Sequence, residues 1–391
     1  IRSQVAANHV CSQKIIEMME DEGLDTLDDL ADEIIDRTEI SMRAAIEKIP
    51  DGVYDHTGII EGAGSKPDIP IKLSVQVAGS KIHVDFAGSS KQVPWGVNVV
   101  YNFTYAYVFM AIKSAFDPGV PINEGAIRPI TMSAPQGSIV NCTFPAAVAA
   151  RMVVGHFMTE MVFNALAKAA PDNIIAGSGG TPAQTNIFHG SFANGKPWHT
   201  MIIRGGGMGA SSRFDGHHCA IFPANGANTP VEILESDTSM MVESRGLIED
   251  SGGPGKHRGG LGRQMIIRSP INGEASCGTT SIAVQAGRYI YPPEGMFGGK
   301  NGSLARFQKN GENADPSGLT FMEPGDRISF ISAGGGGYGD PFERDPKAVE
   351  KDVQYGYVSI EKAKSEYGVV IEPESLELDL SGTQQLRGKN K

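Results

Sequence analysis

The chain has 391 residues, of which 40% are hydrophobic, and its formal net charge is -11 at pH 7. This length and apolar content predict two or three domains with a sizeable core, and exclude a disordered or collagen-like chain despite the 49 glycines. The negative charge argues against nucleic acid and against an anionic membrane surface as partners.

The four cysteines are scattered along the chain without a C-x-x-C pair. This pattern predicts neither a disulfide framework nor a zinc site, and it indicates a reducing, cytoplasmic environment. The most apolar segment, residues 97–115, is interrupted by asparagine, threonine and lysine. It therefore predicts a buried helix and not a membrane span.

The N-terminal fifty residues have a helical pattern of apolar positions. Residues 4–19 predict one helix, which Gly23 is expected to end. Residues 27–49 predict a second helix with Thr26 as its N-cap. Together they predict an acidic helical hairpin over residues 1–50, which is more typical of a scaffold or docking surface than of chemistry.

From residue 52 the apolar pattern changes to a period of two. Residues 71–77 and 81–86, joined by a glycine–serine turn, predict a β-hairpin in which His83 faces solvent. A buried, aromatic helix is predicted over residues 101–116.

The loop that follows this helix holds three polar side chains, Asn123, Glu124 and Arg128, near two prolines. A rigid loop with such groups is suited to positioning a ligand. A capped loop that satisfies buried backbone groups has the same composition. Both interpretations stay open.

Residues 130–145 predict strands, and residues 146–170 predict a helix that carries Arg151 and His156. A spacing of five residues places these two side chains about 140° apart on a helix, so they would not share a face. A histidine at such a position is more often packed in the core than catalytic.

The second half of the chain predicts a β-rich structure. Strands are expected at residues 187–192, 199–204, 230–234 and 264–267. Between the last two lies the segment 250–262, DSGGPGKHRGGLG, whose six glycines disfavour both helix and strand.

Similar glycine clusters recur at residues 204–209, 297–302 and 334–339. So many glycines indicate that another backbone or a ligand comes within contact distance. We expect segment 250–262 to be mostly buried against the cluster at 334–339 or a partner subunit, with Asp250 or Arg258 in a charge-assisted hydrogen bond.

Two of these clusters partly match a dinucleotide-binding fingerprint, but neither is followed by a helix start, so that kind of nucleotide site is not predicted. Asp215, His217 and His218 form the one acid–histidine cluster. No third ligand is visible near the two histidines, so we predict that they bind no metal.

Six motifs occur in this order along the chain: PINEGAIRPI, TFPAAVAARMVVGH, RGGGMGA, NTPVEILE, EDSGGPGKHRGGLGRQ and SAGGGGYGDPFERDP. With them the chain resembles the hydantoinase B/oxoprolinase family over nearly its whole length. The resemblance implies a B-type subunit of a two-component enzyme, whose hydantoinase A-like partner holds ATP and Mg²⁺. Members open cyclic amides such as hydantoins, 5-oxoproline and lactams, while relatives carboxylate acetone or acetophenone.

Family members usually have a further N-terminal region, and in metal-containing relatives a His-x-x-Asp motif lies there. This chain begins at Ile1 and has no such motif, so any divalent metal is expected on a segment outside it. The resemblance also implies a small-molecule substrate and a hetero-oligomer.

In the expected reaction, ATP activates an amide carbonyl or bicarbonate, and this chain completes hydrolysis or carbon–carbon bond formation in a closed pocket. Three alternatives stay open: a cyclic amidohydrolase subunit, a carboxylase subunit, and a noncatalytic scaffold that completes the partner's site. The candidate residues are Glu124, His156 and Asp250 for catalysis, Asn123, Arg128, Arg151 and Arg258 for substrate binding, and none for metal.

The predicted fold class is α+β with several domains. The expected units are a helical hairpin over 1–50, an α+β domain over 51–175, a β-rich glycine-loop domain over 176–345, and a C-terminal helix with a polar tail over 346–391. The composition of about the last twenty residues predicts disorder.

Overall fold

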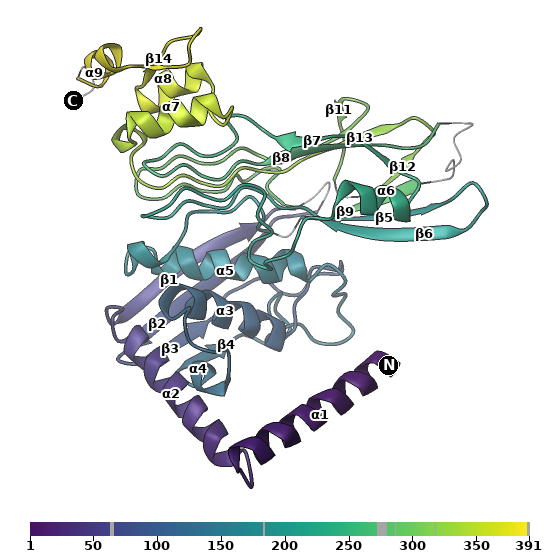
Figure 1. Ribbon diagram of the computed structural model, residues 1–391, viewed down its shortest axis with the longest axis vertical. Coiled ribbons are helices and arrows are strands. Elements are labelled where there is room, and N and C mark those ends of the chain that lie inside the picture. Colours follow the sequence, from purple (N-terminus) through teal and green to yellow (C-terminus); the bar gives the residue numbers. More distant parts are fainter. Residues whose placement is uncertain (63–65, 183, 272–279, 286, 317, 389–391) are drawn as a thin grey trace.

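The computed structural model describes residues 1–62, 66–182, 184–271, 280–285, 287–316 and 318–388. Figure 1 shows an elongated molecule in which an α/β domain, a β-rich domain and a small C-terminal unit follow one another, and helix α1 projects from one end. The predicted α+β fold with several domains is confirmed. The residue limits of the four expected units stay a prediction.

Two helices, α1 (Arg2–Glu22) and α2 (Asp28–Ile46), form the N-terminal arm. Gly23 ends α1 in the left-handed conformation, as predicted. The predicted hairpin is wrong, because α1 diverges from α2 and none of its residues is buried (Figure 1). The buried stripe of α2, which includes Met42 and Ile46, packs on the α/β core and leaves no apolar face for α1.

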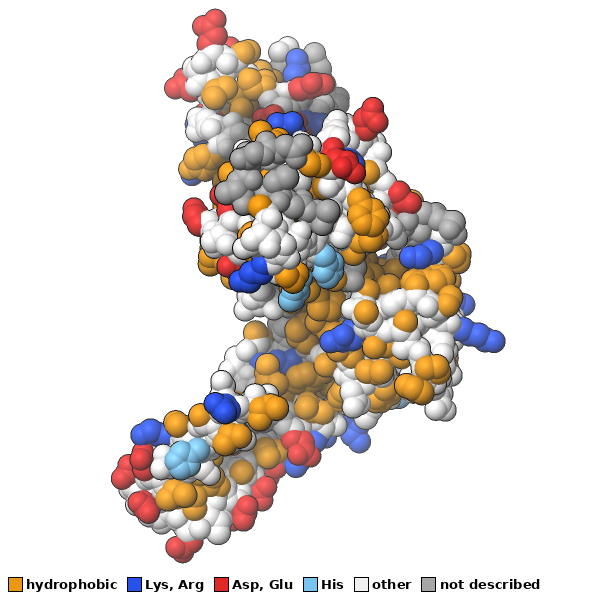
Figure 2. Space-filling view, turned by 90° about the vertical axis from the view of Figure 1, so that its right-hand side faces the viewer, with side chains coloured by type: hydrophobic (Ala, Val, Ile, Leu, Met, Phe, Trp, Pro, Cys, Tyr) orange, Lys and Arg blue, Asp and Glu red, His pale blue; other side chains and the backbone are white. Residues whose placement is uncertain are grey.

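Apolar side chains therefore remain in solvent along the arm. Val5, Val10 and Ile16 of α1 are 64%, 54% and 54% exposed. Figure 2 shows the arm standing out from the body of the molecule, with orange side chains along it.

The α/β domain contains a sheet with the strand order β1 (Gly52–Ile60), β2 (Ile69–Ala78), β3 (Lys81–Asp85) and β4 (Ile130–Ser133). The predicted hairpin is confirmed as β2 and β3, and β4 runs parallel to β3. His83 lies on the outer face of this sheet, as predicted, but it is half-buried there, because its ring contacts the hydroxyls of two residues on β4.

Helices α3 (Tyr101–Phe116) and α5 (Met152–Leu166) lie side by side and share one core with the sheet (Figure 1). The predicted bounds of α3 are confirmed. Helix α5 begins later than predicted, because residues 146–150 form turns that bond to the loop around Gly96. Arg151 is consequently the N-cap of α5 and does not lie on the helix.

Two short helices complete this domain. The loop after α3 forms α4 (Glu124–Ile127), and η1 (Pro171–Asn173) follows α5.

The β-rich domain consists of two sheets, with the strand orders β11-β10-β13-β8-β7 and β12-β9-β5-β6. Its apolar core includes Phe188 and Phe330, whose ring centroids lie 5.9 Å apart. The strands are β5 (Thr185–Ser191), β6 (Pro197–Ile203), β7 (Met241–Leu247), β8 (Arg263–Arg268), β9 (Thr280–Gln285), β10 (Arg306–Lys309), β11 (Glu312–Asn313), β12 (Leu319–Met322) and β13 (Arg327–Ile331).

The strand predicted at residues 230–234 is wrong, because this segment belongs to helix α6 (Val231–Asp237). Pro230 precedes the first turn, and the Thr238 hydroxyl donates to the Leu234 carbonyl at the end. A short apolar run cannot distinguish strand from helix by periodicity.

Extended, glycine-rich segments lie between the α/β domain and the C-terminal unit (wavy traces above α5 in Figure 1). We call them the glycine bundle; they comprise residues 175–180, 204–210, 215–222, 250–262, 293–302 and 333–339. Their backbones bond to one another directly: Gly207 N–H donates to the Ala333 carbonyl, and Gly335 N–H donates to the Gly260 carbonyl, each at 2.9 Å.

Segment 250–262 is mostly buried in this bundle against residues 334–339, which confirms the prediction. A Cβ atom on Gly259 would lie only 2.0 Å from the Gly335 carbonyl oxygen. Glycine is therefore required here by the close approach of the backbones.

The C-terminal unit contains η2 (Pro341–Glu343), α7 (Pro346–Gln354), α8 (Ile360–Tyr367), β14 (Val370–Ile371), β15 (Leu378–Asp379) and α9 (Leu380–Gly388). The predicted disorder of the tail is wrong up to Gly388. Thr383 is buried and its hydroxyl accepts the Val370 N–H, and Arg387 donates to the Tyr367 carbonyl. Residues 389–391 lie outside the described residues.

Candidate functional site

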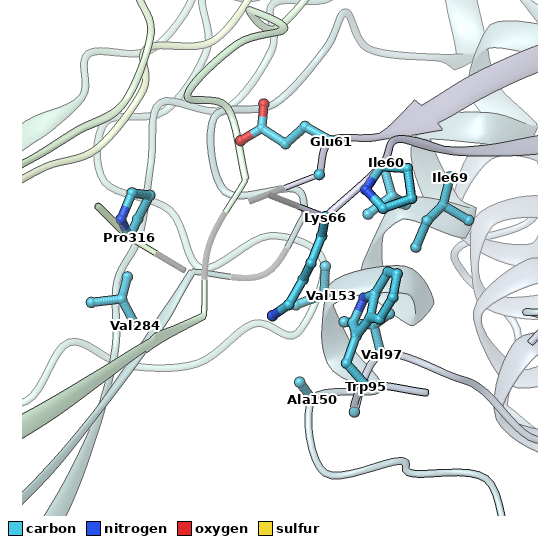
Figure 3. Close-up of a pocket in the computed structure, with 13 residues that line it drawn as sticks. Ile60, Glu61, Lys66, Ile69, Trp95, Val97, Ala150, Val153, Val284 and Pro316 are labelled. Carbon is cyan, nitrogen blue, oxygen red and sulfur yellow. The ribbon is translucent and has the colours of Figure 1, made fainter. Parts of the chain in front are cut away.

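A pocket of about 130 Å³ lies between the α/β domain and the β-rich domain (Figure 3). We call it the interdomain pocket. Most of its wall is apolar, and two of its polar side chains are Glu61 and Lys66. An apolar cleft between domains with a few polar groups is typical of a small-molecule site. The apolar lining comes from Ile60, Ile69, Trp95, Val97, Ala150 and Val153 of one domain and from Val284 and Pro316 of the other.

Glu61 holds the two domains together at the rim of this pocket. Its carboxylate accepts the backbone N–H groups of Tyr289 and Ile290 at 2.8 Å each, and that of Tyr291 at 3.3 Å. The Tyr291 hydroxyl also donates to Asp68 at 2.6 Å. Because these N–H groups occupy both oxygens of Glu61, its role is positioning and not proton transfer.

Lys66 carries the positive charge of the pocket. Its ammonium nitrogen lies 5.8 Å from the centroid of the Trp95 ring, close enough for a cation–π contact. Among the described residues, no carboxylate forms a salt bridge with it. A free ammonium beside an aromatic face and apolar walls can bind a small molecule through one anionic or carbonyl oxygen.

A buried ion pair lies between α5 and the segment that follows β9. Arg288 Nη2 is 2.6 Å from Glu160 Oε1, and both side chains are 6% exposed. The Thr181 hydroxyl donates to the same carboxylate at 2.6 Å. This pair fixes α5 to the glycine bundle and to the segment whose next residues bond to Glu61.

Sequence reasoning missed both members of this pair, since 128 residues separate them. A signal for Glu160 was present: it is the only acid in the otherwise apolar run 152–166. A lone carboxylate on a helix that is buried almost all round must have a buried partner.

Asn123, Glu124 and Arg128 lie at the contact between α2 and α4, away from the residues that line the interdomain pocket. The Asn123 amide donates to the Thr38 hydroxyl at 3.0 Å, and Arg128 lies 3.0 Å from Glu39. Glu124 is mostly exposed. These contacts correspond to the capped-loop interpretation.

Arg151 and His156 lie at the start of α5. The Arg151 guanidinium lies 5.3 Å from the Phe103 ring centroid. His156 is 1% exposed and its ring centroid is 5.1 Å from that of Tyr107. Burial lowers the pKa of His156 to about 4, so its ring is neutral at pH 7.

Asp250 and Arg258 connect the glycine bundle to the C-terminal unit. The exposed Asp250 carboxylate accepts the Ser359 N–H at 2.9 Å. The buried Arg258 guanidinium pairs with Asp352 at 3.3 Å, which confirms the expected charge-assisted hydrogen bond. The seven candidate residues thus occupy three separate regions, and their catalytic and binding roles stay predictions.

The comparisons with known proteins agree with the motif pattern. The sequence profile of the hydantoinase B/oxoprolinase family matches residues 1–341. This chain belongs to that family.

The family member is 33% identical to the putative D-/L-hydantoinase B subunit of Pseudomonas sp. (strain NS671), over 99% of this chain and 67% of that protein. It is 30% identical to the caprolactamase beta subunit of Pseudomonas jessenii, over 95% of this chain and 66% of that protein. Identity to the acetophenone carboxylase delta subunit of Aromatoleum aromaticum is 24%, over 96% and 61% of the two chains. The chain therefore spans about two thirds of these relatives.

Two solved structures have the same fold. The crystal structure of the ATP-dependent caprolactamase from Pseudomonas jessenii superposes with a TM-score of 0.85 at 28% identity, covering 98% of this chain and 68% of the other. The nucleotide-free structure of acetone carboxylase superposes with a TM-score of 0.77 at 18% identity, covering 90% and 54%. Such low identity to the second structure shows the fold alone.

The acid–histidine cluster of this family member is part of its scaffold. Asp215 binds Arg344 through two hydrogen bonds of 2.7 Å. His218 accepts the Leu261 N–H through Nδ1 at 2.9 Å, and its segment runs through the glycine bundle. Within the described residues, no three His, Cys, Asp or Glu side chains are arranged to hold a metal ion. We therefore assign no metal ligand here.

The helices were also compared with the dimensions of a bilayer. In the part of the chain that the structure describes, none is both long enough and apolar enough to cross a membrane.

Proposed function

We propose that this chain is the B-type subunit of an ATP-dependent amidohydrolase that opens a cyclic amide: a hydantoin, 5-oxoproline or a lactam. A hydantoinase A-like subunit would hold ATP and Mg²⁺. The observation that supports this proposal is the 33% identity to a hydantoinase B subunit over 99% of the chain. Identity to the carboxylase relatives is lower, at 24% and 18%.

The reaction needs activation, because amide resonance makes an unstrained lactam slow to hydrolyse. In the proposed sequence, the partner transfers the γ-phosphoryl group of ATP to the amide oxygen. Water then adds to the activated carbon, the C–N bond breaks, and phosphate leaves.

The interdomain pocket is the proposed place for the activated intermediate. Its apolar walls limit the access of water, and the Lys66 ammonium offers positive charge to the phosphoryl or carbonyl oxygen. Many N–H groups of the glycine bundle already bond to neighbouring backbones, so Lys66 is a better candidate donor than a glycine loop. Arg151 follows Ala150, which lines the pocket, and stays a candidate for substrate binding.

The test uses the chain in complex with its A-type subunit. ATP turnover and ring-opened product are measured with hydantoin, 5-oxoproline and caprolactam, with and without bicarbonate. The proposal predicts ring opening without bicarbonate. Turnover that strictly requires bicarbonate, with no ring-opened product, would identify a carboxylase subunit instead, as the similarity to the acetophenone carboxylase delta subunit suggests.

The pocket is tested with Lys66→Met and a matched exposed lysine on β2, Lys72→Met. We expect K66M to lower kcat about 100-fold, the effect of removing one oxyanion donor, while K72M has no effect. Both variants should assemble normally by size-exclusion chromatography. An assembled K66M complex with unchanged turnover would refute the pocket and favour the noncatalytic scaffold.

A further inference from the structure

Arg204, directly after β6, is a buried arginine without a hydrogen-bond partner. Its side chain is 1% exposed and its guanidinium lies 5.0 Å from the ring centroid of Phe330. Among the described residues, none accepts a hydrogen bond from Nε, Nη1 or Nη2. A buried charge in a protein is normally paired, because its transfer from water is unfavourable.

The other strongly buried arginines show what this pairing looks like. Arg288 pairs with Glu160, Arg258 pairs with Asp352, and Arg344 pairs with Asp352 and Asp215. Each of them has a carboxylate within 3.3 Å. Arg204 departs from this rule of the same molecule.

The electrostatic surroundings of Arg204 are also cationic. Arg263, 4% exposed, is close enough for Arg204 to contribute to the lowering of its pKa, which burial brings to about 10. Burial lowers the pKa of Arg204 itself, and the neutral hydroxyl of Tyr289 opposes this change. Within the described residues, no carboxylate contributes at either guanidinium.

Further polar groups without partners face the same region. Asn186 on β5 lies opposite Ile202 on β6, so its side chain is on the sheet face that Arg204 continues two residues later. Asn186 is fully buried, and neither its amide nitrogen nor its oxygen is paired. The buried Tyr289 hydroxyl is also unpaired. Guanidinium, amide and hydroxyl groups are all hydrogen-bond donors that suit an anion.

We infer that Arg204, Asn186 and Tyr289 form a binding site for a small monovalent inorganic anion inside the β-rich domain. One negative charge neutralises one guanidinium, and the near-complete burial of Arg204 excludes an organic ligand unless the sheets separate. The site goes beyond the proposed function, and it does not depend on which amide the complex opens.

The test has two parts, both on the chain with its A-type subunit. Crystals soaked in bromide should show an anomalous peak within hydrogen-bonding distance of the Arg204 guanidinium. In thermal unfolding at constant ionic strength, chloride should raise the midpoint by several degrees relative to gluconate, and the increase should saturate.

The variants are Arg204→Met and a matched control, Arg288→Met. Arg288 is as buried as Arg204 but has a carboxylate partner, so R288M should unfold at a lower temperature and keep the response to chloride. R204M should lose the response. Equal midpoints in chloride and gluconate, or a chloride response that persists in R204M, would overturn the inference. If R204M does not fold, the bromide map of the unmodified complex decides.

Discussion

Arg344 and Asp215 lie 129 residues apart in the sequence and share two hydrogen bonds of 2.7 Å. The same guanidinium binds Asp352 at 2.8 and 3.1 Å, and Asp352 also accepts from Arg258. Arg258 and Asp215 belong to the glycine bundle, and Asp352 belongs to α7. The network therefore attaches the C-terminal unit to the bundle through buried, mutually neutralising charges.

We expect Asp352→Asn to lower the free energy of unfolding by about 3–5 kcal/mol, because it leaves two buried guanidinium groups short of a counter-charge. Urea titration of the purified complex measures this. Lys347→Gln, which removes an exposed pair with Glu350, is the control and should cost about 0–1 kcal/mol. Equal stability of the two variants would contradict a structural role for the network.

Gly260→Ala tests the close contacts of the bundle. A Cβ atom there would lie 2.0 Å from the carbonyl oxygen of His217, so a backbone has to move. We expect a loss of about 1–3 kcal/mol or more. Gly246→Ala on β7 is the control, since nothing lies within 4 Å of its Cβ position, and it should change stability by less than about 1 kcal/mol. The prediction fails if both variants unfold at the same urea concentration.

His156 makes stability depend on pH. Its folded pKa of about 4 is below the ordinary value of 6.5, because burial disfavours the charged ring. Its contribution is therefore fully present above pH 6.5 and is lost as the pH falls toward 4, by roughly 3 kcal/mol in total.

We expect His156→Phe to flatten this part of the profile of unfolding free energy against pH, while its ring still packs on Tyr107. His9→Gln on the exposed helix α1 is the control and should leave the profile as in the unmodified chain. A profile of H156F that is as steep as that of H9Q would show that another group titrates.

Glu61→Gln tests the contact between the two domains. The amide would bring a donor toward backbone N–H groups that now share a carboxylate, so we expect a loss of about 2 kcal/mol. Hydrogen exchange of residues 289–291 should become faster. Glu47→Gln, an exposed change at the end of α2, should leave this exchange unaltered. Unchanged protection in E61Q would mean that other contacts hold the segment.

Local patterns were sufficient for several elements. The bounds of α3 and the β2–β3 hairpin follow from runs whose period and end signals agree. The glycines of segment 250–262 predicted a close approach between backbones, because an ordinary solvated turn can be built with asparagine, aspartate or serine in their place. The run at 230–234 was too short to distinguish a strand from the first turns of α6.

The site was harder to predict, because its parts come from distant segments. Lys66 and Val284 meet in the interdomain pocket, and no local pattern links them. The motif residues Asn123 and Arg128 attracted attention as polar groups in a rigid loop, but they bond to α2. Polar groups that cap a loop and polar groups that bind a substrate have the same appearance in a sequence.

The glycine bundle also has a consequence for biosynthesis. Its last segment, residues 333–339, provides bonding partners for Gly177, Gly207, Gly253 and Gly260. A growing chain cannot close the bundle until these residues leave the ribosome, whereas most of the first core lies before residue 175. We therefore expect a chain that stalls before residue 333 to carry a folded first domain and a row of unpaired backbone groups, which a neighbouring chain can bind.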